Sequence, residues 1–260
     1  MSARPILFAA ISAAFVTGWV VDAPRTTRYR IETQVEQVID LSAVGQAEQR
    51  NNLTLANFLT ITFDDTVGGQ TIHAVLDSIV KLSDGPVPEQ DSLDKARGRT
   101  WHALLAADGK VSDVKRVDSS SSGQVSDLLT NFFPRVRPGA KVGDQWTDTT
   151  ESTSSEEGQS LTTRTVTNYS VTGTETRNGA RALKVESAFS LAQTGEINQG
   201  GQSLSVDGSG TGTGTYFVTQ DGRYLGGTST TSAELQITAA AIPAPIPVQV
   251  KNTVTVTTLP

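Results

Sequence analysis

The sequence predicts an all-β protein with one large curved antiparallel sheet, half-barrel or barrel-like, one short helix, and an N-terminal transmembrane helix in front of the sheet. Apolar and polar residues alternate along several segments, as is typical of half-buried strands. Only 18% of the 260 residues are charged, and Ser, Thr and Gly take their place, a mixture that favours strands and turns. A long uncharged segment follows Arg4. The length suits one domain or two fused halves.

Residues 1–23 are expected to direct the chain to a membrane, and two interpretations stay open. As an anchor, the uncharged stretch Pro5–Val21 lies near the lower limit of the roughly 17 to 25 residues that span a bilayer. Trp19 then lies where an interfacial aromatic belongs, and Gly18 permits close packing against other spans. As an export signal, the segment ends at a candidate Val21-x-Ala23 cleavage site. Pro24 fits this interpretation poorly, because it would directly follow the bond that is cleaved.

Two opposing signals bear on which side of the membrane the β domain lies. Arg25, Arg28 and Arg30 come after the segment and only Arg4 precedes it, which by the positive-inside rule favours a cytoplasmic domain. The signal-like start and the cysteine-free, Ser/Thr/Gly-rich body favour export. We expect a single span in a bacterial inner membrane with the β domain in the periplasm, and the cytoplasmic side remains an alternative.

The body of the chain is expected to consist of strands. The first strand would place one set of apolar side chains on a single face: Tyr29, Ile31, Val35, Ile39 and Leu41. A hairpin follows, with a turn at residues 64–69 and inner faces formed by Leu53, Leu55, Leu59, Ile61 and Phe63, then Ile72, Ala74, Leu76, Val80 and Leu82. Later runs at 183–191, 216–218, 235–237 and 248–256 bring the total to roughly ten to twelve strands.

One internal helix is expected at Gln124–Phe133, where apolar residues recur at helical spacing and Pro134 follows. The Pro/Gly-rich stretch after it divides the β domain into a first half, 24–134, and a second half, 135–260. The halves share a pattern. Asp108-Gly109-Lys110 and Asp221-Gly222-Arg223 each follow an expected strand and precede another, which fits two hairpins related by duplication.

Glycine occupies every second position in Gly208, Gly210, Gly212 and Gly214. A phosphate loop would need a tight turn before a helix, and no such context is present. The series predicts a strand with one bare face, against which something bulky lies or around which the sheet curls. A helix, an aromatic side chain, a neighbouring subunit or an apolar ligand could lie there. We therefore expect partner or ligand contacts at these four glycines, at Gly18 and at Trp19.

Residues suited to catalysis are scarce. His73 and His102, the two histidines, fall in strand patterns, and nucleophile-elbow and zinc-protease motifs are absent from the sequence. Asp64, Asp65, Asp144 and Asp148 flank turns, where aspartate is favoured for local hydrogen bonds, and Trp146 is expected in the core. We predict no enzyme activity, no metal and no cofactor. The net charge of −6 and the absence of a long Lys/Arg cluster give no electrostatic footprint for phosphate backbones, so we expect no nucleic-acid partner.

The stretches "FFPRVRPGAKVGDQWTDT" and "GTGTYFVTQDGRYLGG" resemble those of uncharacterised exported bacterial β domains. These domains are similar in outline to lipoprotein-carrier half-barrels, curved sheets wrapped over a short helix with an apolar pocket. With its anchor kept, the layout also resembles single-span accessory subunits of membrane assemblies such as photosynthetic reaction centre–light-harvesting complexes. No histidine in residues 1–23 could ligate a chlorophyll, so such a role would be structural.

Two functions follow as expectations. The first is a non-catalytic, membrane-anchored accessory subunit whose β domain docks on integral membrane subunits, with residues 5–21 in the lipid bilayer. The alternative is a periplasmic carrier or binding protein for an apolar ligand or lipid, held on the concave face of the sheet.

Overall fold

The computed structural model describes residues 25–67, 69–83, 93–94, 96–117, 129–156, 159–199, 202–239 and 244–260. They form one antiparallel sheet of 11 strands, which confirms the all-β expectation and the expected number of strands. Across these ranges, no helix has the length and apolar character needed to cross a membrane. The expected span, with Gly18 and Trp19, lies outside the described residues.

The first half contains β1 (Arg25–Ile39), a 3-10 turn η1 (Ser42–Val44), β2 (Gln49–Thr66), β3 (Gly69–Lys81), β4 (Thr100–Ala106) and β5 (Val111–Arg116). The second half contains β6 (Gln145–Glu156), β7 (Gln159–Arg177), β8 (Ala180–Gln199), β9 (Gln202–Thr219), β10 (Tyr224–Ala239) and β11 (Ile246–Leu259). The predicted hairpins therefore form.

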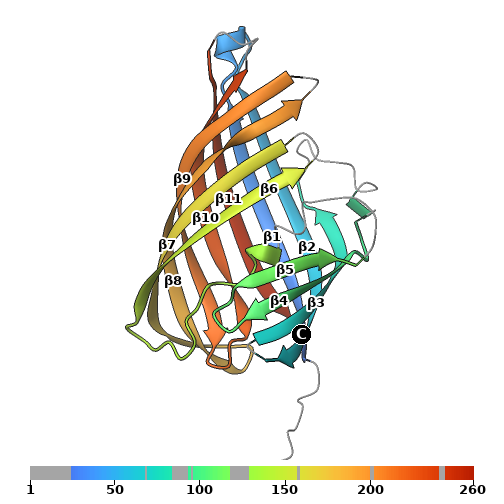
Figure 1. Ribbon diagram of the computed structural model, residues 1–260, viewed down its shortest axis with the longest axis vertical. Helices are drawn as coiled ribbons and strands as arrows, with labels where there is room; N and C mark the ends of the chain where they lie inside the picture. Colours follow the sequence, from blue (N-terminus) through green and yellow to red (C-terminus); the bar gives the residue numbers. More distant parts are fainter. Residues whose placement is uncertain are drawn as a thin grey trace, which may run out of the picture.

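The strand order is β5-β4-β3-β2-β1-β11-β10-β9-β8-β7-β6. The first and last strands of the chain thus pair in the middle of the sheet, with Ile31 opposite Val256. The edge strands, β5 and β6, are consecutive in sequence. Figure 1 shows that the sheet is strongly twisted and coiled, with both edge strands at the front of the view.

One part of the predicted hairpin is wrong. β2 and β3 change register at Asp77, which has no partner on β2 and accepts a 2.7 Å hydrogen bond from the Thr60 hydroxyl. An extra residue in one strand exchanges the faces of all residues after it. Ile79 is therefore buried, whereas Val80 and Leu82, expected on the inner face, are 37% and 48% exposed.

The concave face of the sheet is filled by residues 129–140, which we call the inner segment. Only Leu129 and Thr130 of the expected helix are helical in the described part, since a turn follows and residues 124–128 lie outside it. The Phe132 ring lies 5.0 Å from that of Tyr29 and 5.5 Å from that of Tyr224. The inner segment therefore belongs to the core, and Figure 1 shows its helical turn inside the coiled sheet.

The glycine series lies on β9 and faces the concave side, like its neighbours Val206 and Val218, which are buried. A Cβ atom at Gly212 would overlap the ring of Phe189, and one at Gly214 would overlap the ring of Tyr216. The bulky objects beside these two glycines are therefore aromatic side chains of the protein itself. The missing side chains leave room for them on the inside of a tightly coiled sheet.

The two Asp-Gly hairpins have the same local geometry. In the first, between β4 and β5, Ala106 N–H donates to Lys110 O at 2.8 Å; in the second, between β9 and β10, Thr219 N–H donates to Arg223 O at 2.9 Å. Gly109 and Gly222 have φ angles of +87° and +84°. Each hairpin then contains a register shift.

A positive-φ residue lies four positions after the turn glycine in both hairpins, Asp113 at 52° and Gly226 at 102°. All these equivalent positions are 113 residues apart in the sequence. The correspondence supports the predicted duplication.

We expect Gly212→Ala to lower the free energy of unfolding by about 1–3 kcal/mol, the usual cost of overpacking a core, because the new methyl group overlaps Phe189. Gly173→Ala is the matched control, since a Cβ at this strand glycine would have no atom within 4 Å. Urea unfolding measures both. Equal stability of the two variants would contradict this account of the glycine series.

Exchanging the residues at the two equivalent positive-φ positions should have unequal effects. Gly226→Asp should cost about 2–3 kcal/mol, because the φ of 102° strains an L residue and the Cβ overlaps the Val256 carbonyl oxygen. Asp113→Gly should stay within about 1 kcal/mol of the wild type, because glycine adopts this φ freely. Thermal or urea unfolding tests the pair, and a similar loss in both would refute the argument.

A candidate binding pocket between the two Asp-Gly hairpins

A cavity of about 580 Å³ lies between the two Asp-Gly hairpins and the inner segment. We call it the hairpin pocket. One wall comes from the β4–β5 hairpin and the opposite wall from the β9–β10 hairpin, while the inner segment and the loop to Lys141 separate them. Segments from both halves of the chain therefore build the pocket, and Gly69, Gln70 and Leu183 complete its lining.

The two walls are formed by equivalent residues. Leu105, Ala106, Ala107 and Gly109 on the first hairpin correspond, at the same offset of 113 residues, to Val218, Thr219, Gln220 and Gly222 on the second, and all eight line the cavity. The pocket thus lies between two related hairpins, and the inner segment makes it asymmetric.

The floor of the pocket is apolar. Its side chains are at most 9% exposed and belong to the core: Leu105, Phe133, Val136, Leu183, Val218 and Tyr224. The Tyr224 ring contacts the rings of Phe132 and Phe133 at centroid distances of 5.5 Å and 6.2 Å. Such a floor favours contact with apolar groups of a ligand.

Arg135 fixes the inner segment to the first hairpin. Its Nη2 lies 2.7 Å from Asp108 Oδ2, and its Nε lies 3.9 Å from Asp148 Oδ2 on β6. The indole N–H of Trp146 donates to the Arg135 carbonyl oxygen at 3.1 Å. Trp146, expected in the core, therefore binds the backbone of this arginine. Asp148, expected to flank a turn, lies within β6 close to the guanidinium.

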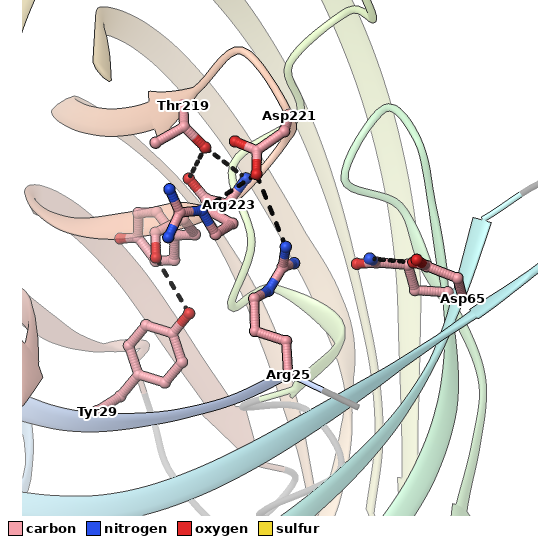
Figure 2. A network of polar contacts seen from close by, with 8 residues as sticks. Arg25, Tyr29, Asp65, Thr219, Asp221 and Arg223 are labelled. Atoms are coloured by element: carbon pink, nitrogen blue, oxygen red, sulfur yellow. Dashed lines mark hydrogen bonds and ion pairs between the residues drawn. The ribbon is translucent and has the colours of Figure 1, made fainter. Parts of the chain in front are cut away.

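Arg25 makes the corresponding contact with the second hairpin. Its guanidinium lies 3.8 Å from Asp221 Oδ2, which also contacts Arg223 Nε at 3.1 Å, and Figure 2 shows the three side chains converging. Burial alone would raise the pKa of Asp221, but a hydrogen bond from Thr219 and the charges of Arg223 and Arg25 outweigh it and lower that pKa.

Arg25 and Arg135 each follow a proline, and each pairs with the Asp-Gly turn of the other half. The turn aspartates are therefore already neutralised by arginines.

Two further cations lie at the rim of the hairpin pocket, Arg137 and Lys141, and both are exposed. The Arg137 guanidinium lies 6.0 Å from the centroid of Trp146, whose ring stacks on that of Tyr169 at 5.3 Å. Within the described ranges, neither cation is within ion-pair distance of a carboxylate. The carboxylate of Asp144 accepts a hydrogen bond from the Lys141 backbone N–H instead.

The four glycines predicted as contact sites do not line this pocket, and Gly18 and Trp19 lie outside the described residues. Gly208, Gly210, Gly212 and Gly214 lie on β9, but none of them lines it. His73 and His102 face each other across β3 and β4 with ring centroids 4.7 Å apart, outside the pocket lining. No cluster of three or more potential metal ligands occurs among the residues that the structure describes. The signal that could have indicated the pocket is the repeated Asp-Gly turn.

Comparison with known proteins identifies no family. No family model and no curated protein matches the chain. DynF, from the dynemicin biosynthesis pathway of Micromonospora chersina, is similar at a TM-score of 0.26 and 7% identity, over 98% of this chain and 92% of that one. A loop-deletion mutant of OmpT, an outer membrane protein of Vibrio cholerae, is similar at a TM-score of 0.23 and 8% sequence identity, over 90% of this chain and 100% of that one. These TM-scores are too low to carry an argument.

All four tyrosines of the chain are expected to ionise only at high pH. Burial raises the pKa of Tyr169 to about 12 and raises those of Tyr29, Tyr216 and Tyr224 above their ordinary value of 10.0. Above pH 10 the unfolded chain releases these protons while the folded protein retains them, so the free energy of unfolding should fall as the pH rises. Tyrosinate absorbance and urea unfolding, measured together below and above pH 10, test this. Tyrosinate formed near pH 10 in a still folded protein would be the contrary result.

Proposed function

We propose that the protein is a non-catalytic binding protein or carrier for an apolar or amphipathic ligand, held in the hairpin pocket. The observation that carries the proposal is a cavity of about 580 Å³ with an apolar floor and a polar rim. Ligand pockets typically measure about 300–1,000 Å³ and have such linings. Each buried methylene group of a ligand would contribute about 0.8 kcal/mol, so one alkyl chain provides enough driving force for binding.

The packing around the pocket also supports a binding role. Aromatic contacts and the Arg135–Asp108 ion pair hold the floor and the first wall in place, so a ligand need not order them first, and preformed sites bind at lower entropic cost. A coiled sheet wrapped over an inner segment is also the arrangement expected for a half-barrel carrier. We propose that the sheet is a half-barrel of this kind.

An anchored accessory role in a membrane complex is a second proposal, supported by the uncharged stretch Pro5–Val21. Intact mass of protein purified from membranes tests it. Retained Met1 together with co-purifying integral membrane subunits would support the role, and a soluble mature form beginning near Pro24 would contradict it. The same fractionation tests the predicted periplasmic location.

Filling the pocket from its rim should weaken binding without disturbing the core. Ala107 and Gln220 are exposed, equivalent positions on the two walls, so Ala107→Trp and Gln220→Trp should each raise the Kd of a fluorescent long-chain alkyl probe at least about tenfold, or about 1.4 kcal/mol. Leu104→Trp, at an exposed position outside the pocket lining on β4, is the control and should leave the Kd unchanged. A wild-type protein that binds no alkyl probe would refute the proposed function.

A further inference from the structure

The charges at the hairpin pocket differ from those of the chain as a whole. The protein carries a formal net charge of −6, yet the pocket lining contains two cations, Arg137 and Lys141, and one anion, Asp221. Asp221 is already engaged by Arg25 and Arg223. The lining of the pocket therefore carries more positive than negative charge, in an otherwise acidic protein.

Both rim cations line the same pocket. Arg137 lies in the inner segment and Lys141 directly follows it, where the Lys141 backbone N–H donates a 2.9 Å hydrogen bond to the Asp144 carboxylate. The Arg137 guanidinium lies over Trp146, which is itself stacked on Tyr169. A planar guanidinium that rests on an aromatic ring keeps its N–H donors free at its edge, and these match the oxygens of a carboxylate or phosphate.

The apolar floor and the cationic rim together define a ligand chemistry. An apolar chain would contact Phe133, Leu105 and Val218, while its polar end would remain at the rim near Arg137 and Lys141. The volume of about 580 Å³ is in the middle of the range for one small ligand, so it suits one chain and not several.

We infer that the hairpin pocket selects a single-chain amphiphile with an anionic head group, whose charge is bound by Arg137 and Lys141. The inference rests on the proposed function and specifies its ligand class. A carboxylate and a phosphate share the chemistry that the two cations recognise, and the experiment separates them.

The test compares three ligands with the same alkyl chain: a fatty acid, a lysophosphatidic acid and the neutral monoacylglycerol. Dissociation constants are measured by calorimetry at low and at physiological salt, below the critical micelle concentration. The wild type should bind at least one anionic ligand about tenfold more tightly than the neutral one, and added salt should reduce this preference because the rim is exposed. The tighter of the two anionic ligands identifies the head group.

The variant Arg137→Ala/Lys141→Ala should reduce the ratio of neutral to anionic Kd from about ten to about one. Arg137→Lys should retain part of the preference, since it keeps the charge but loses the planar fork. Lys115→Ala, which removes an exposed cation on β5 outside the pocket lining, should keep the wild-type ratio.

The possible failures are distinguishable. If none of the three ligands binds, the proposed function itself is wrong. If the neutral ligand binds as tightly as both anionic ones, or if the double variant keeps the preference, the function stands and the inferred head group is wrong. An equal loss for charged and neutral ligands in the double variant would show that the two cations serve only the pocket structure, which also overturns the inference.

Discussion

The packing of the inner segment against the concave face of the sheet is the constraint on which the rest of the structure depends. A coiled sheet of 11 strands has an inner face too strongly curved to be covered by a second sheet, so the chain fills it with Leu129, Phe132 and Phe133, which are at most 7% exposed. These rings contact Tyr29 and Tyr224 from opposite halves of the chain. The same packing fixes the position of the hairpin pocket, because the inner segment leaves the core between the two Asp-Gly turns.

Two ion pairs hold the halves together at this end of the sheet. Arg25, at the start of the first half, pairs with Asp221, and Arg135, at the start of the second half, pairs with Asp108. β1 pairs with β11, which pairs in turn with β10, and this order brings Arg25 close to the β9–β10 turn. The Arg135–Asp108 pair has a different origin, the contact of the inner segment with the β4–β5 hairpin, where Val136 N–H also donates to the Asp108 carbonyl oxygen at 2.9 Å. The two corresponding ion pairs and the shared hairpin geometry fit the predicted duplication.

The sequence predicts the positions of the strands better than their register and packing. Alternation located β1 and the β2–β3 hairpin, since burial of Tyr29, Ile31 and Ile72 leaves a local period of two. It could not reveal the bulge at Asp77, because an apolar segment with one inserted residue still has the composition of a strand. The helical spacing at 124–133 predicts an isolated helix, whereas its described end turns after Thr130. Contacts with Tyr29 and Tyr224, which are distant in the sequence, position Phe132 there. The glycine series was rightly assigned to a strand, but Phe189 and Tyr216, which lie beside Gly212 and Gly214, are identified only by the sheet register. The pocket could be recognised only in the tertiary structure, since its two walls are 113 residues apart in the sequence.

The electrostatics of the rim follow from the same arrangement. Four aspartates lie near the pocket, yet three of them are engaged by arginines that hold elements together, at distances of 2.7 to 3.9 Å, and Asp144 accepts a backbone hydrogen bond. Paired charges only a few ångströms apart largely cancel at a distance, and exposed charges are screened beyond a Debye length of about 8 Å at physiological salt. Attraction of an anion to the mouth therefore depends on the cations that no structural pair uses. In the part of the chain that the structure describes around this pocket, Arg137 and Lys141 fit that description, so ligand selectivity at the rim can change without loss of the ion pairs that maintain the fold.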